Sequence, residues 1–221
     1  MNLARFAPFF IRVLAISPLF AVSNPVGAAP VPTLSFDVTA RVAATNRSAG
    51  PEQTVGAKVL LRGPAARVES SSGGTRTVVL FTPPYIYRLL PDSKAGVRWK
   101  IPARKASNYA DFDPQQLLRD PTKIRAAMLR GGAKIIGKGV LGGMPVEIYQ
   151  AKNFGGRGQN AKVWLRRSDS LPLRLESSGA QFKIVASWRN YARPKLGAGL
   201  FSAPTGYRVR TLAEAPPFSA L

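Results

Sequence analysis

Residues 34–42 read LSFDVTARV, and apolar side chains alternate with polar ones along the whole stretch. In an extended strand, successive side chains point to opposite faces of the sheet. This period of two therefore predicts a strand with one buried face and one face toward solvent. The same period recurs along most of the chain, so it decides the fold class.

Further alternating segments lie on both sides of residue 120 and are separated by turns rich in Gly, Pro, Asn and Ser. Short turns of this composition between strands favour an antiparallel meander over alternating helices and strands. The predicted strands cover residues 55–62, 66–70, 75–81, 85–90 and 97–101 in the first half, and residues 133–141, 146–151, 161–167, 173–176 and 182–188 in the second.

One helical stretch interrupts the strands. Asp113-Pro114 and Asp120-Pro121 each place a capping aspartate before a proline at the first helical position. The second segment carries Met128 on its apolar side, and Gly131-Gly132 ends it. Two short helices are therefore predicted between the two runs of strands.

A long antiparallel sheet must curl to cover its apolar face. The sequence thus predicts a mainly β (α+β) fold, a strongly curved antiparallel half-barrel sheet with a short inserted helical lid. Two arrangements of the enclosed side chains fit this pattern: they line an apolar ligand cavity, or they fill the space as ordinary core. The candidate cavity residues are Phe36, Val38, Val59, Leu61, Val79, Phe81, Tyr87, Trp99 and Met128, with Arg67, Arg98 and Lys100 at the rim, where a cation can meet an anionic head group.

Residues 1–28 have the features of a secretory signal peptide. Arg5 and Arg12 are its only charges, an apolar run follows at residues 13–22, and Val26-Gly27-Ala28 fits the small-residue cleavage pattern. An uncleaved anchor is the alternative, but this apolar run is shorter than the roughly 20 residues of a membrane span. We expect a periplasmic or otherwise exported chain with a single domain over residues 29–221.

Composition argues against catalysis. The 221 residues include neither Cys nor His, which excludes a thiolate nucleophile, a lipobox cysteine for acylation, and the commonest general base and metal ligand. Among the carboxylates, Asp113 is explained as a helix cap beside Asp111, and Glu69 and Glu147 are expected on outward strand faces in solvent. We therefore expect no enzyme activity, no cofactor and no metal site.

Lys and Arg number 32 against 11 acidic residues, which gives a formal net charge of +21. Such an excess favours contact with anionic membrane surfaces or polyanions. A nucleic-acid partner is disfavoured because the chain carries an export signal, although the charge alone would permit one.

Three short motifs carry a resemblance to a known family. They are KVLLRGP at residues 58–64 leading to RVE at 67–69, VWL at 163–165 followed by LPLR at 171–174, and WRNY at 188–191 followed by LF at 200–201 and PTGYRV at 204–209. Together with the order of elements, they resemble the periplasmic lipoprotein-carrier family with the LolA/LolB-like fold, over about residues 34–210. The resemblance implies a half-barrel closed by helices around an apolar cavity that holds acyl chains. Relatives of this fold also act as envelope-stress sensors.

Two functions follow as hypotheses. The first is an exported soluble binding protein, acting as a monomer, that holds an acyl chain or a lipoprotein in its cavity and carries it between envelope membranes. The second is a basic surface adaptor or envelope-stress sensor that docks on anionic lipid, lipopolysaccharide or an acidic protein partner without cavity binding.

Overall fold

The computed structural model of the chain describes residues 31–44, 52–101, 124–130, 132–152, 158, 160–179 and 182–214. The predicted signal peptide and the first predicted helix lie outside these residues, and so do Asp111 and Asp113.

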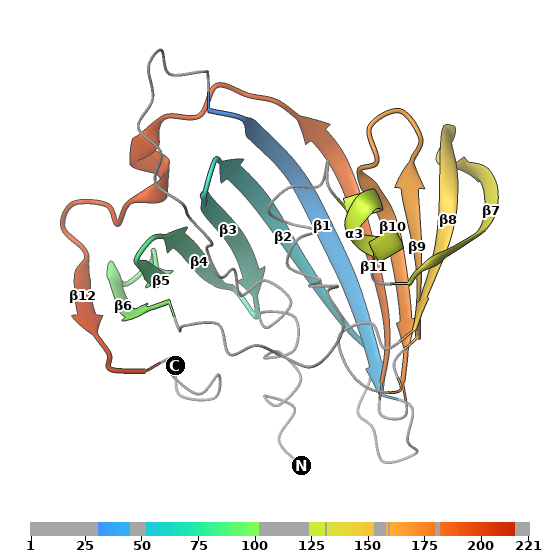
Figure 1. Cartoon of the computed structure of the whole chain (residues 1–221). Helices are drawn as coiled ribbons and strands as arrows, with labels where there is room; N and C mark the ends of the chain where they lie inside the picture. The colour runs from blue at the N-terminus through green and yellow to red at the C-terminus, as the bar shows by residue number, and fades with distance from the viewer. Residues whose placement is uncertain are drawn as a thin grey trace. The chain divides into compact units, whose positions relative to one another are not determined.

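Twelve strands within the described ranges form one sheet, in the order β12-β6-β5-β4-β3-β2-β1-β11-β10-β9-β8-β7 (Figure 1). The strand pairs with a defined register are antiparallel except β12, which runs parallel to β6. The strands are β1 (Thr33–Ala44), β2 (Gln53–Arg62), β3 (Ala65–Ser72), β4 (Thr75–Thr82), β5 (Tyr85–Leu90), β6 (Ala95–Lys100), β7 (Lys134–Leu141), β8 (Met144–Lys152), β9 (Asn160–Arg166), β10 (Pro172–Ser178), β11 (Phe182–Ala192) and β12 (Arg208–Thr211).

The predicted fold class is confirmed, since the chain is mainly β with an open antiparallel sheet and a short helix inserted between β6 and β7. That helix, α3, spans Ile124–Arg130, and a 3-10 turn, η3, spans Ala198–Phe201. Every strand predicted from the alternating pattern is present. Strand β12 was not predicted, because its pairing with β6 joins segments about 110 residues apart and leaves no local signal.

The chain divides into two compact units. The described parts of the first unit fall within Val38–Val55 and Lys105–Arg189, and those of the second within Ile16–Asp37, Gly56–Arg104 and Asn190–Leu221. In the first unit, one face of β8–β11 is buried and α3 contacts it. A cross-strand row shows its make-up, with Tyr149, Val163, Leu175 and Ala186 aligned through direct pairing and all buried.

In the second unit, the sheet has two different faces, and one of them carries the C-terminal segment. Turn η3 contacts β3 and β4, and β12 extends the same sheet beyond β6 (Figure 1). Of the helices within the described ranges, none combines the length and apolar character that crossing a bilayer requires.

Candidate ligand-binding face

One face of β2–β6 is built from two cross-strand rows. Directly opposite residues on neighbouring antiparallel strands share a face, so the register alone defines each row. The first row is Val59, Val68, Val79, Arg88 and Val97, and the second is Leu61, Ala66, Phe81, Ile86 and Trp99. All nine apolar members are buried. We call these ten residues the valine-row face.

Arg88 stands in the first row where the other four strands each supply a valine. Its Nε and Nη1 atoms are buried, and neither has a hydrogen-bond partner in the described part of the chain. Burial lowers the pKa of the guanidinium. Because an arginine stays protonated in proteins, this face holds a cation whose charge is not compensated by the residues described.

The opposite face of the same strands is covered by the C-terminal segment. Val78, Leu80 and Leu89 form a buried cluster there, and η3 docks beside it through two hydrogen bonds to its backbone. Arg67 Nη1 donates to the carbonyl of Leu200 at 3.0 Å, and the Thr82 hydroxyl donates to the carbonyl of Phe201. The half-buried residues that pack on the cluster are Tyr87, Ala203, Tyr207 and Val209.

The structure brings together five of the nine residues proposed from sequence to line a cavity, which are Val59, Leu61, Val79, Phe81 and Trp99. Tyr87 is a correction. It pairs with Leu80 and Arg98 and packs on the opposite face, because residue 87 is out of phase with residues 86 and 88.

The other three predicted cavity residues are also buried but lie elsewhere. Phe36 contacts Tyr191, with ring centroids 5.4 Å apart. Val38 and Met128 belong to the first unit, where Met128 is fully buried on α3. The valine-row face accordingly rests on β2–β6 alone.

The predicted rim cations require a second correction, since Arg67, Arg98 and Lys100 lie on the face opposite the valine-row face. The Arg67 Nε donates to Glu69 at 2.6 Å. Arg98 lies 4.8 Å from the centre of the Tyr85 ring and donates to Thr211 at 2.9 Å. The partners of Arg67 and Arg98 come from the chain itself.

A polar trio ties α3 to the sheet of the first unit. Arg125 Nε donates to the hydroxyl of Tyr149 at 2.8 Å, and this hydroxyl donates to Glu147 Oε2 at 2.8 Å. Arg125 Nη2 also lies 2.9 Å from Glu147. Burial is the largest cause of the raised pKa of Tyr149, and the hydrogen bond that Arg125 donates to Tyr149 is the largest cause of the raised pKa of Arg125.

This trio overturns the expectation that Glu147 points into solvent. Its side chain is only 12% exposed and shares a face with the buried Tyr149, because the helix that the sequence places after residue 120 folds back onto β8. The three groups neutralise and position one another, so they form a structural link between α3 and β8.

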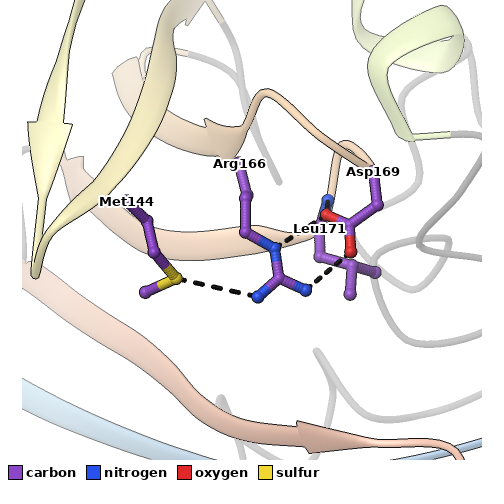
Figure 2. Close-up of polar contacts among 4 residues, drawn as sticks. All are labelled: Met144, Arg166, Asp169 and Leu171. Atoms are coloured by element: carbon purple, nitrogen blue, oxygen red, sulfur yellow. Dashed lines mark hydrogen bonds and ion pairs between the residues drawn. The ribbon is translucent and has the colours of Figure 1, made fainter.

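The hairpin between β9 and β10, which contains one of the three family-like motifs, is held by an arginine and an aspartate (Figure 2). Arg166 binds Asp169 through Nε at 2.9 Å and Nη2 at 2.6 Å, and its Nη1 contacts the sulfur of Met144 at 3.7 Å. Asp169 also accepts the backbone N–H of Leu171 at 3.2 Å. Arg166 and Asp169, which lie between the two parts of the motif, therefore stabilise the turn.

Within the described ranges, no three acidic side chains converge on one point. Sequence reasoning did not assign Arg88 to this face, although a signal was present. Residues 86, 88 and 90 share one phase of β5, and Arg88 is the only charged residue among them. A lone cation in an otherwise apolar phase is the pattern that marks such a position.

Comparison with known proteins finds likeness in structure, while no family model and no curated protein matches the chain. The chain is similar to an uncharacterised conserved protein from Thermus thermophilus, with 13% identity over 80% of this chain and 90% of that one and a TM-score of 0.50. It is also similar to a LolA superfamily protein from Nitrosomonas europaea (12% identity, 79% and 91% covered, TM-score 0.40) and to LprF from Mycobacterium bovis (16% identity, 78% and 90% covered, TM-score 0.43). These likenesses concern the fold alone, and a member of the LolA superfamily, which the motifs resemble, is among them.

Proposed function

We propose that this protein is an exported binding protein that holds the hydrocarbon chain of a lipid or lipoprotein against the valine-row face and carries it between envelope membranes. The observation that carries the proposal is the pair of cross-strand rows on β2–β6, which present nine apolar side chains on one face. All nine are buried in the structure, so the proposal requires the hydrocarbon chain to take the place of the groups that cover them.

Burial of a hydrocarbon chain on this face can supply a favourable binding free energy. Each methylene transferred from water gains about 0.8 kcal/mol, so a sixteen-carbon chain gains roughly 13 kcal/mol before ordering costs. Val59, Leu61 and Phe81 are aliphatic or aromatic groups that suit hydrocarbon and lack polar atoms. Binding of a hydrocarbon chain to such groups requires no chemical step. The proposal accordingly treats the protein as a carrier and not as an enzyme.

A second candidate is a basic surface adaptor or envelope-stress sensor that docks on anionic lipid, lipopolysaccharide or an acidic protein. The formal charge of +21 favours it. The two candidates differ in salt dependence, because charges at an exposed surface are screened within about 8–10 Å at physiological salt whereas burial of hydrocarbon is not.

Native mass spectrometry of protein purified from a cell envelope tests the carrier proposal. We expect an adduct with the mass of a lipid or acylated peptide, and we expect its binding to persist at 1 M NaCl. A protein that arrives without an adduct, binds no fatty acid at any salt concentration, and binds anionic vesicles only at low salt would be the adaptor instead.

A further inference from the structure

Arg88 has no counter-ion in the described part of the chain, whereas four other arginines form short ion pairs. The four others with a short ion pair each meet a carboxylate, with nitrogen–oxygen distances of 2.6 Å in Arg67–Glu69, 2.9 Å in Arg125–Glu147, 2.6 Å in Arg166–Asp169 and 2.7 Å in Arg174–Glu176. Arg88 instead lies between Val79 and Val97, which are directly opposite it on β4 and β6. Two of its three nitrogens are buried and lack hydrogen-bond partners in the described residues.

An unpaired cation among valines is costly to the folded state, since buried charges are normally paired and hydrogen-bonded. Four of the five positions in this row show that valine suits the site. Residues whose side chains do not suit the surrounding structure are concentrated at functional sites. A guanidinium has five donors in a planar fork that matches the oxygens of a carboxylate or phosphate. The missing group is therefore an anion.

Two more cations lie on β12, at the edge of the sheet. On β12, Arg210 pairs with Val97 and Arg208 pairs with Ala95, and both arginines are exposed. Paired residues share a face, so Arg210 lies at the end of the row that contains Arg88, and Arg208 lies on the same face at the end of the next row. Exposed cations raise the local concentration of anions.

We infer that the amphiphile bound on the valine-row face carries one oxyanion, a carboxylate or a phosphate, that binds the Arg88 guanidinium while its hydrocarbon chain lies along the flanking apolar residues. This inference rests on the proposed function and narrows it to fatty acids, phospholipids and related anionic lipids. A neutral chain would leave Arg88 without a partner.

The test uses three twelve-carbon probes that share a tail and differ in the head: laurate, dodecyl phosphate and 1-dodecanol. Affinities are measured at pH 8 for the wild type, Arg88→Leu and Arg88→Lys. Arg76→Leu is the matched control, because Arg76 is an exposed arginine on the neighbouring strand β4 and its removal changes the net charge equally.

We expect Arg88→Leu to weaken one or both anionic probes by roughly 10- to 100-fold, as loss of charge-assisted hydrogen bonds does, and to leave 1-dodecanol binding unchanged. The affinity of Arg88→Lys for the anionic probes should lie between those of the wild type and Arg88→Leu, because lysine keeps the charge and lacks the planar set of donors of a guanidinium. The relative losses of laurate and dodecyl phosphate identify the carboxylate or the phosphate as the natural head.

Three outcomes separate this inference from the function on which it rests. Equal binding of all three probes by the wild type, unchanged in Arg88→Leu, overturns the inference and leaves the carrier proposal standing. Equal weakening by Arg88→Leu and Arg76→Leu also overturns it, because net charge then explains the effect. A wild type that binds none of the probes overturns the carrier proposal itself.

Discussion

Val79 lies directly opposite Arg88 across the β4–β5 pair, so the two side chains share a face and their Cβ atoms are neighbours. A carboxylate at residue 79 would thus meet the unpaired guanidinium. Residue 79 is therefore a position from which a counter-ion for Arg88 can be supplied.

We expect Val79→Glu and Arg88→Leu to be strongly coupled. The new glutamate pairs with Arg88 in the single variant, whereas in the double variant it is buried without a cation. Urea unfolding of the four proteins in a double-mutant cycle should give a coupling free energy of about 1.5–3 kcal/mol. Val79→Glu should also abolish laurate binding, because the internal carboxylate occupies Arg88.

Val78→Glu is the control for that cycle. Val78 is adjacent in sequence but lies on the opposite face, within the cluster with Leu80 and Leu89. The variant should be destabilised and show no coupling to Arg88→Leu. Similar coupling for residues 78 and 79 would mean that the guanidinium is not held on the valine-row face.

A glycine in β6 makes the close approach to β5 beside Arg88 possible. A Cβ atom at Gly96 would lie 2.6 Å from the carbonyl oxygen of Arg88 and 2.7 Å from a methyl carbon of Leu89. Gly96→Ala should therefore lower the free energy of unfolding by about 1–3 kcal/mol, as overpacking does. Denaturant midpoints measure this directly.

Gly139→Ala in β7 is the matched substitution, because a Cβ there meets nothing within 4 Å. It should be neutral or stabilise the fold by up to about 1 kcal/mol. If Gly96→Ala were as well tolerated, the close approach of β5 and β6 would be wrong.

The fold was readable from sequence because its signals are local. Alternation at residues 34–42 defined β1, and turn residues defined the hairpins that follow. The same logic placed Val79 and Phe81 on one face. It could not place β12, whose partner β6 lies far away in the chain. It also could not show that Tyr87 packs on the same buried cluster as Tyr207 and Val209 of the C-terminal segment.

The site was harder to predict because charged residues were sorted by general rules. Arg67 and Arg98 were assigned to a ligand because cations favour a rim, yet both have partners supplied by the chain. Glu147 was assigned to solvent, yet α3 brings Arg125 against it. Only the three-dimensional pairing distinguishes a charge that has a partner from one that has none, and within the described residues it shows Arg88 Nε and Nη1 without a hydrogen-bond partner.

Tyr149 predicts an alkaline limit to stability in the first unit. Its pKa is raised above the usual 10.0, mainly by burial. The contribution of Tyr149 to the free energy of unfolding is therefore complete below pH 10. It is lost as the pH rises through the higher pKa that Tyr149 has in the folded state. Tyr149→Phe should cost about 1–2 kcal/mol at pH 8, where the hydrogen bonds to Arg125 and Glu147 are lost. The difference from wild type should shrink at pH 11 in urea titrations, and a difference independent of pH would contradict the assignment.

The β9–β10 hairpin offers a last test of which ion pairs matter. The bidentate contact of Arg166 with Asp169 is largely shielded, with side chains 23% and 29% exposed, and Asp169 also accepts the Leu171 N–H (Figure 2). Asp169→Asn keeps the shape and one acceptor but removes the charge, so it should cost about 1–2 kcal/mol. Glu52→Gln removes a partner of Arg41 at 3.8 Å, in a pair whose side chains are about half exposed, and should cost under about 0.5 kcal/mol. Thermal unfolding at low and high salt separates them, since the Asp169 effect should persist in 1 M NaCl. Equal costs for the two substitutions would show that the hairpin depends on its backbone turn and not on this ion pair.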